Sequence, residues 1–193
     1  MRKEIAMLAV VSAMFPIHNE ATAPLTIVMM SKERNLLRQL ERMSYRDQLT
    51  QFGNRYAVDW FVEHEWNGEQ IGVVYCDITG LKKVNDEQGH EAGDRLIIRA
   101  CECLAGVFKG YGLYRIGGDE FLVLCLGIEE KDLREHVEKL RMDMKEHQVT
   151  MAVGMIWKEH GPKDIDLLLN ESERLMYEDK DRYYKEHGLK RRR

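Results

Sequence analysis

Apolar positions along the chain follow two different spacings, which alternate from about residue 47 to residue 184. Apolar residues three or four positions apart predict helices, whereas short continuous apolar runs bounded by turn residues predict buried strands. The predicted helices cover residues 55–66, 81–87, 91–107, 130–146 and 165–184, and the predicted strands cover residues 71–78, 111–116, 121–126 and 150–157. This order predicts an α/β sandwich in which helices flank a central mixed sheet of about five strands.

The strands at residues 111–116 and 121–126 meet in the segment Arg115-Ile-Gly-Gly-Asp-Glu-Phe121, which predicts a β-hairpin with acids at its tip. We expect Gly117 and Gly118 to adopt positive φ angles in a tight turn and to let a bulky ligand approach the backbone. Asp119 and Glu120 would then stand where a metal or a phosphate group can reach them. The alternative is an ordinary hairpin whose acidic turn residues are solvated.

A second acid, Asp77, ends the apolar run at residues 71–76. Open α/β sheets usually bind their ligands at the carboxyl ends of strands. A carboxylate at that position loses hydration, and a divalent cation shared with Asp119 would offset the cost. The alternative is an aspartate that caps the following helix.

The composition favours one globular domain with an attached segment. The 193 residues carry 29 basic and 33 acidic side chains, and this slightly acidic balance argues against a large nucleic-acid footprint. All four cysteines lie in apolar stretches without metal-ligand spacing: Cys76, Cys101, Cys103 and Cys125. They are typical of reduced core residues, which predicts a cytoplasmic protein.

The ends of the chain differ from its centre. Residues 1–44 predict an N-terminal segment and linker helix. Their first apolar run contains Glu4 and is far shorter than the roughly 20 residues of a membrane span, so we expect no membrane contact. Residues 31–43 have apolar positions at helical spacing, which predicts an amphipathic helix entering the domain. Residues 187–193 predict a solvated basic tail.

Five motifs resemble the GGDEF domain of diguanylate cyclases, in the family's order. Besides the hairpin motif, they are Asp77-Ile-Thr-Gly-Leu-Lys-Lys-Val-Asn-Asp86, Gly89-His-Glu-Ala-Gly-Asp-Arg-Leu-Ile97, Asp47-Gln-Leu-Thr-Gln-Phe-Gly-Asn-Arg55 and Glu173-Arg-Leu-Met-Tyr-Glu-Asp-Lys180. Any one of them would be a weak signal, but chance agreement of all five is negligible. The resemblance implies a GGDEF domain at residues 45–186 with the nucleotidyl-cyclase, palm-type fold and the hairpin at its active site.

The family's activity implies that two GTP molecules, one on each subunit of a homodimer, are condensed to cyclic di-GMP and two pyrophosphates. Two Mg²⁺ ions, or Mn²⁺ in their place, would stabilise the attacking and leaving oxygens. By resemblance the metal ligands are Asp77, the Ile78 carbonyl, Asp119 and Glu120. Asp119 also matches the residue proposed to accept the 3′-hydroxyl proton, which makes the hairpin acids the catalytic pair.

The resemblance also implies a set of nucleotide contacts. Asn85 and Asp94 would select guanine, because an amide and a carboxylate can together address the carbonyl and the N–H donors that distinguish it from adenine. Lys82 and Lys180 match positions that bind the triphosphate. His90 would contact the ribose or merely pack beside the turn, and Arg115 would contact the acids of the site or the nucleotide. Gly118 would lie under the ligand. Without the motifs, Asn85 would be interpreted as a turn residue and Asp94 as an exposed helical acid. The opening motif is interpreted as structural, with polar side chains at a helix start: Asp47, Asn54 and Arg55.

Several positions depart from the family pattern. Thr79 replaces a common second aspartate, Gln51 replaces a glycine, and Tyr184 replaces a phosphate-binding arginine, for which Arg182 or the basic tail could substitute. Phe108 and Tyr111 stand where the family's product-inhibition motif has arginine and aspartate, so we expect no feedback there. Two alternatives to an active cyclase stay open: a catalytically inactive module that regulates a partner, and a different nucleotidyl cyclase. An upstream sensor domain is a further expected partner.

Overall fold

The computed structural model describes residues 45–188, and the predictions for residues 1–44 and for the basic tail beyond residue 188 lie outside that range. The helices are α3 (Arg55–His64), α4 (Leu81–Gln88), α5 (His90–Val107), α6 (Glu130–Glu146) and α7 (Asp166–Glu186). The strands are β1 (Ile71–Ile78), β2 (Gly112–Arg115), β3 (Glu120–Leu126) and β4 (Met151–Lys158). The α/β sandwich predicted from the spacing of apolar residues is therefore confirmed.

The sheet differs from the prediction in its strand number and direction. Within the described residues it has four strands in the order β2-β3-β1-β4, and each neighbouring pair is antiparallel. Four strands come close to the predicted number of about five, whereas the predicted mixed direction was wrong. A strand–helix–strand unit normally gives a parallel pair. Here β3 and β4, which α6 connects, are separated by β1, so they do not pair with each other.

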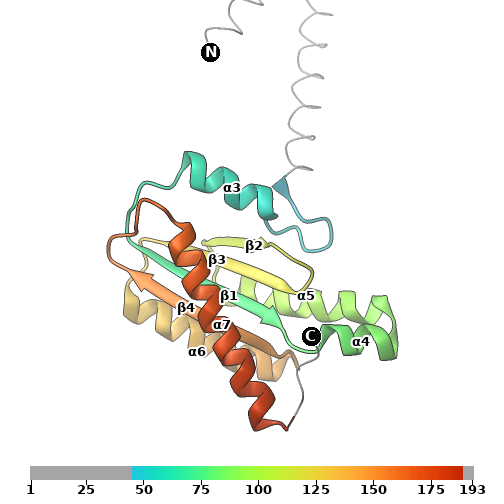
Figure 1. Cartoon of the computed structure of the whole chain (residues 1–193). Coiled ribbons are helices and arrows are strands. Elements are labelled where there is room, and N and C mark those ends of the chain that lie inside the picture. Colours follow the sequence, from blue (N-terminus) through green and yellow to red (C-terminus); the bar gives the residue numbers. More distant parts are fainter. Residues whose placement is uncertain (1–44, 189–193) are drawn as a thin grey trace, which may run out of the picture. The chain divides into compact units, whose positions relative to one another are not determined.

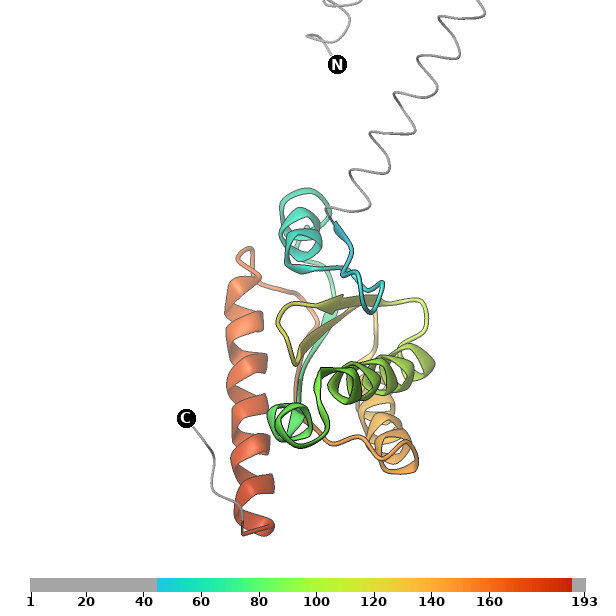
Figure 2. The same cartoon turned by 90° about the vertical axis from the view of Figure 1, so that its right-hand side faces the viewer.

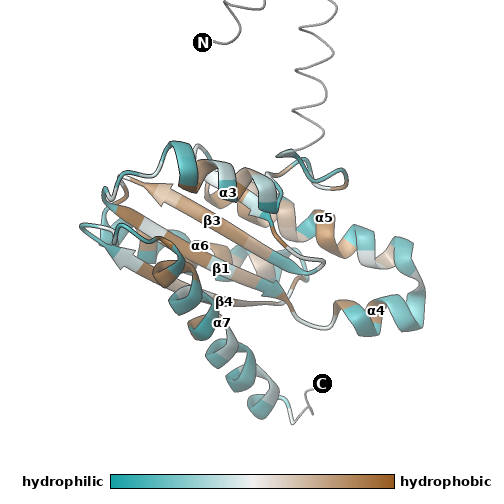
Figure 3. Ribbon diagram, turned by 45° about the horizontal axis from the view of Figure 1, so that its top comes forward, coloured by the Kyte–Doolittle hydropathy of each residue, from teal (hydrophilic) through white to brown (hydrophobic). Residues whose placement is uncertain are grey.

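Side chains of β1 alternate between two apolar layers. Val74, Cys76 and Ile78 belong to the core beneath α5 and α6, whereas Val73 and Tyr75 belong to the core beneath α3 and α7. All eight positions of β1 are buried, as expected for a central strand covered on both faces. Figures 1 and 2 show α7 on one face of the sheet and α5 and α6 on the other. In Figure 3 the strands form a continuous hydrophobic band between these helices.

The backbones of α7 and β4 approach closely at Gly154. A Cβ atom at this position would lie 2.1 Å from the Ser172 carbonyl oxygen and 2.3 Å from the Met176 nitrogen. Since neither backbone can yield as a flexible side chain would, this glycine sets the distance between α7 and the sheet. Lys180 lies one helical turn after Met176, so the same contact determines where Lys180 reaches the sheet.

The cysteine prediction is confirmed as far as the structure extends. All four cysteines are buried and carry free thiols. Burial raises the pKa of Cys76, Cys101 and Cys125 to about 12, which keeps these thiols protonated and unreactive at neutral pH. Among residues 45–188, no helix is long and apolar enough to cross a membrane.

Candidate active site at the hairpin

The hairpin between β2 and β3 meets the end of β1, and this junction brings the predicted acidic residues together. Asp77 is the register partner of Glu120 in the β1–β3 pair. The Ile78 N–H donates a hydrogen bond of 2.9 Å to the Asp119 carbonyl oxygen. Asp77 is only 4% exposed, while Asp119 and Glu120 are half-buried. Sheet pairing alone thus places all four predicted metal-ligand residues at one end of two adjacent strands.

The two hairpin glycines do not work as predicted. Neither Gly117 nor Gly118 has a positive φ angle. Gly117 is constrained by space instead, because a Cβ there would lie 2.5 Å from a carboxylate oxygen of Glu120. Nothing lies within 4 Å of a Cβ placed on Gly118, which leaves its backbone open to a ligand. The expected close approach of a ligand therefore stays a prediction for Gly118, whereas the turn geometry was wrong for both.

Lys180 reaches the sheet from α7 and binds Asp77. Its Nζ lies 2.6 Å from Asp77 Oδ1, and the two side chains are 14% and 6% exposed. A short charge-assisted contact at this depth stabilises the buried carboxylate. The family resemblance implies a phosphate contact for Lys180 and a metal contact for Asp77, but in this structure the two residues neutralise each other.

Glu120 has a raised pKa, because it is half-buried among other acidic side chains. Burial raises the pKa of its carboxyl group, and the negative charges of Asp119 and Asp77 raise it further. Glu173 on α7 adds to this effect, while Lys180 opposes it. Glu120 and Glu173 also line a cavity of about 400 Å³ between α3, α7 and the sheet. Positive charge arriving beside these acids would relieve their repulsion.

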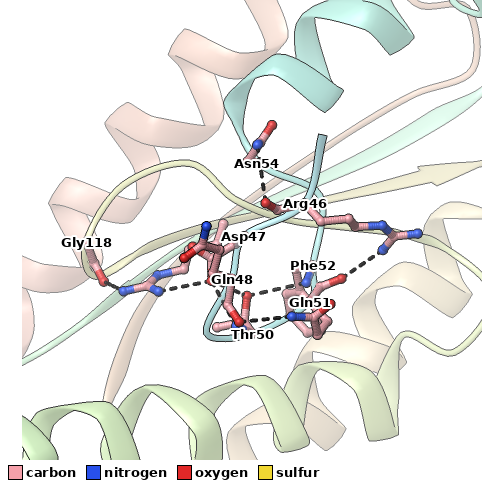
Figure 4. A network of polar contacts seen from close by, with 9 residues as sticks. Arg46, Asp47, Gln48, Thr50, Gln51, Phe52, Asn54 and Gly118 are labelled. Carbon is pink, nitrogen blue, oxygen red and sulfur yellow. Dashed lines mark hydrogen bonds and ion pairs between the residues drawn. The ribbon is translucent and has the colours of Figure 1, made fainter. Parts of the chain in front are cut away.

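Arg115 ties the hairpin tip to the segment that precedes α3. Its Nη1 lies 3.0 Å from Asp47 Oδ1, and its Nη2 donates to the Gly118 carbonyl oxygen at 2.8 Å (Figure 4). Burial alone would raise the pKa of Asp47, but hydrogen bonds from the Thr50 hydroxyl and N–H, together with Arg115, lower it. In this structure Arg115 therefore binds Asp47 and the hairpin backbone, and its expected contact with the acids of the site or with the nucleotide stays a prediction.

Gln51 occupies a strained backbone position within the same turn. Its φ angle is +62°, in the left-handed region that favours glycine. The Gln51 side chain donates to the Gln48 carbonyl oxygen at 2.9 Å, which partly compensates. Asn54 begins α3, because its side chain accepts a hydrogen bond from the Ala57 N–H at 3.2 Å. A helix cap of this kind agrees with the structural role expected for the opening motif.

The expected guanine-binding residues lie on α4 and α5. Asn85 packs against Gly93 so closely that a Cβ on Gly93 would lie 1.9 Å from Asn85 Oδ1. That oxygen is buried and has no hydrogen-bond partner in the structure. Asp94 follows Gly93 in α5 and is exposed, as are Lys82 and His90. The helix junction itself turns at Gly89, whose φ angle is +85°.

The donor set fits a divalent metal ion in its chemistry. Carboxylate and carbonyl oxygens are the ligands that Mg²⁺ prefers, and Asp77, Ile78, Asp119 and Glu120 supply both kinds. The raised pKa of Glu120 reflects negative charge that a cation would offset. Within residues 45–188, however, no three His, Cys, Asp or Glu side chains are grouped as a ready metal-binding cluster. In this structure the carboxylate of Asp77 forms an ion pair with Lys180.

The structure shows what surrounds the residues at which the sequence departs from the family pattern. Arg182 lies 3.6 Å from Asp179 and lines a cavity of about 710 Å³ between α6, β4 and α7. None of the predicted site residues lines that cavity. Arg182 thus pairs with Asp179 and lines a cavity that Lys180 does not line, and Tyr184 packs edge-on against Tyr183. The ring of Phe108 lies 5.6 Å from that of His136, where a structural role accounts for it.

Sequence reasoning missed the spacing roles of two glycines. Gly93 makes room for Asn85, and Gly154 makes room for the α7 backbone. Gly154 stands inside a predicted strand, and a glycine there often marks the close approach of another backbone. That signal was available in the sequence. The contact between Lys180 and Asp77 had no such signal, because it spans 103 positions of the chain.

Comparisons with known proteins agree with this architecture. A family model described as "Diguanylate cyclase, GGDEF domain" matches residues 44–185. The diguanylate cyclase DgcP of Escherichia coli is 28% identical over 152 residues, which are 71% of this chain and 45% of that protein. The bifunctional diguanylate cyclase/cyclic di-GMP phosphodiesterase MucR of Pseudomonas aeruginosa is 29% identical over 159 residues, 75% of this chain and 23% of that protein. The chain thus spans less than half the length of these two relatives.

Solved structures share the fold. The coiled coil and GGDEF domain of DgcB from Caulobacter crescentus, in complex with c-di-GMP, superimposes with a TM-score of 0.75 at 21% identity. That alignment covers 84% of this chain and 94% of the DgcB chain. Since the family model matches well over half of its residues, the chain belongs to the GGDEF domain family.

Proposed function

We propose that this protein is a diguanylate cyclase, which condenses two GTP molecules into cyclic di-GMP and two pyrophosphates. The observation that carries the proposal is the junction of β1 with the hairpin. There the backbone joins Ile78 to Asp119 and pairs Asp77 with Glu120. Four potential oxygen ligands at one strand end, beside a lysine, are a donor set that can bind a nucleoside triphosphate together with its metal ions.

Within this proposal, two Mg²⁺ ions, or Mn²⁺ in their place, would be held by Asp77, the Ile78 carbonyl, Asp119 and Glu120. When bound, the ions would stabilise the charge on the attacking and leaving oxygens. Asp119 accepts the proton of the 3′-hydroxyl as its oxygen bonds to the α-phosphorus of the other GTP. The bond from that phosphorus to the bridging oxygen then breaks, and pyrophosphate leaves. Glu120 would add negative charge that favours the binding of these cations.

Guanine recognition would depend on α4 and α5. The buried Asn85 Oδ1 lacks a partner, and a guanine N–H donor could satisfy it. Asp94 is exposed one residue after the contact between Asn85 and Gly93, where its carboxylate is accessible to the base. His90 would contact the ribose, and Lys82 and Lys180 would contact the triphosphate. Gly118 and Arg115 would shape and support the hairpin beneath the nucleotide.

The reaction requires two sites, so the active form would be a homodimer in which each subunit holds one GTP. We propose residues 45–186 as the catalytic domain, residues 1–44 as the connection to a sensor domain, and residues 187–193 as a basic tail. The protein would act in the cytoplasm in bacterial second-messenger signalling, without nucleic acid or membrane contact. Feedback through the family's product-inhibition motif is not expected, because Phe108 and Tyr111 surround His136 instead of presenting charge.

The test is product formation from GTP and Mg²⁺ at high protein concentration, followed by chromatography with mass detection. Asp119→Ala serves as the matched control, since it removes the proposed proton acceptor from a half-buried position on the hairpin. Cyclic di-GMP from the parent protein and none from the variant would establish both the activity and the role of Asp119. A dimeric parent that binds GTP but forms no product would refute the proposal.

A second candidate is a catalytically inactive GGDEF module, and it is favoured by the residues that follow Lys180 in α7. The family's phosphate-binding arginine is replaced by Tyr184, and Arg182 is engaged with Asp179. Such a module would bind GTP or a protein partner and regulate that partner. GTP binding without turnover, measured by calorimetry on the dimer, would favour this reading over the cyclase.

A further inference from the structure

The contact between Lys180 and Asp77 joins two residues that the proposed function assigns to different ligands. The carboxylate of Asp77 would bind a metal ion, and the ammonium group of Lys180 would bind phosphate. In this structure Lys180 Nζ lies 2.6 Å from Asp77 Oδ1, with side-chain exposures of only 14% and 6%. A metal ion that binds Asp77 must therefore displace the ammonium group or share the carboxylate with it, and either arrangement places the ion beside an existing positive charge.

We propose that Lys180 is an internal counter-ion, which keeps divalent cations off Asp77 until a nucleotide's phosphates draw the lysine away. The inference rests on the proposed function, because it concerns the same site. It adds an order of assembly: metal and nucleotide bind together, while metal alone binds poorly. Lys180 then acts as a positioning residue for the metal as well as a contact for the substrate.

The local charges support this role. Asp77 pairs with Glu120 across the sheet, and Asp119 is joined to Ile78 through the backbone. With three acids at one strand end, the folded protein needs a cation there when no ligand is bound. Lys180 extends from α7, whose distance from the sheet is set by backbone contact at Gly154. The lysine is therefore held at the cluster and is not a mobile surface residue.

Exchange of partners makes the two ligands cooperative. A divalent cation at Asp77 would repel the ammonium group within a few ångströms, so metal binding alone must overcome the existing ion pair. Triphosphate oxygens offer the displaced lysine a new charge-assisted partner. Metal binding and nucleotide binding then strengthen each other by the same factor, because the coupling between two ligands is reciprocal.

The experiment measures Mn²⁺ binding to the full chain by electron paramagnetic resonance, with and without a non-hydrolysable GTP analogue. We expect Lys180→Met to bind Mn²⁺ about tenfold more tightly than the parent when no nucleotide is present. In that variant the nucleotide should improve Mn²⁺ affinity much less than in the parent. Lys83→Met is the matched control, because it removes the same charge from an exposed position on α4 that has no assigned role at the site. Its nucleotide-free Mn²⁺ affinity should stay within about twofold of the parent's, as expected for a screened surface charge.

The outcomes separate this inference from the cyclase activity. Tighter nucleotide-free binding by Lys180→Met alone supports the counter-ion role, whether or not the parent makes cyclic di-GMP. Unchanged or undetectable binding by Lys180→Met, or an equal gain in Lys83→Met, overturns it even if the parent is an active cyclase. If Lys180→Met does not fold, Lys180→Gln carries the test, since its amide can still donate a hydrogen bond to Asp77 without a positive charge.

Discussion

Replacing Gly154 by alanine would separate α7 from the sheet. The added Cβ would lie 2.1 Å from the Ser172 carbonyl oxygen, 2.3 Å from the Met176 nitrogen and 2.9 Å from the Leu175 carbonyl carbon. Ordinary contacts between heavy atoms begin near 3.5 Å, so the backbones must move apart by about 1 Å. All three atoms belong to the helix backbone, and the shift therefore involves the whole of α7 around Met176.

The cost of this shift can be placed within the range for overpacked cores. Overpacking typically costs about 1–3 kcal/mol, and a clash between two backbones belongs at the upper end. Alanine would recover about 0.5–1 kcal/mol through its lower chain entropy in the unfolded state. We expect Gly154→Ala to lower the free energy of unfolding by about 2 kcal/mol, which corresponds to a Tm decrease of roughly 4–8 °C for a chain of this size.

Gly106→Ala is the matched control for this substitution. Gly106 lies within α5, and nothing lies within 4 Å of a Cβ placed there. Because alanine is the better helix former by about 1 kcal/mol, this variant should be more stable than the parent. Urea denaturation followed by circular dichroism measures both. A Gly154→Ala variant within about 0.5 kcal/mol of the parent would refute the close-approach argument, since overpacking of this kind should cost more.

Three further substitutions test individual features of the site. Gly93→Ala should keep or slightly raise stability, because the clash is with the movable Asn85 side chain, but should weaken GTP binding at least tenfold in a calorimetric titration. Gln51→Gly should stabilise the fold by about 1 kcal/mol in urea denaturation by relieving the positive φ angle; a loss of stability would show that the Gln48 hydrogen bond matters more. Because burial and the charges of Asp119 and Asp77 raise the pKa of Glu120 in the folded state, its contribution to stability is present below its ordinary value of 4.5 and is lost as pH rises through the raised value. Glu120→Gln should therefore be more stable than the parent at pH 7, with the difference vanishing near pH 4; equal stabilities at both pH values would contradict the electrostatic account.

Local patterns predicted the elements well because burial on one or both faces leaves a period in the sequence. The run at residues 71–78 coincides with β1, and the helical spacing at residues 130–146 coincides with α6. The strand directions were not predictable in this way. They depend on β1 lying between β3 and β4, and no local period records which strands become neighbours.

The hairpin shows a different limit of sequence reasoning. Two adjacent glycines predicted positive φ angles, yet such angles occur at other glycines of the described residues, among them Gly80 and Gly89 on either side of α4. Gly117 is instead explained by the nearby carboxylate of Glu120, a contact between residues whose conformations depend on each other. A glycine can be required because its φ angle is positive or because a neighbouring atom leaves no room for a Cβ, and the sequence alone does not distinguish these two causes.

Lys180 and Asp77 show why ligand roles are harder to derive than positions. The motifs correctly directed attention to both residues, and the fold brings them to the same strand end. Each motif, however, assigns its residue to a ligand without regard to what the residue contacts when that ligand is absent. A buried carboxylate requires a partner in every state of the protein, so its ligand-free partner must leave or share when a metal arrives. The affinity of this site for metal is therefore a difference between two occupied states, and Lys180 contributes to both of them.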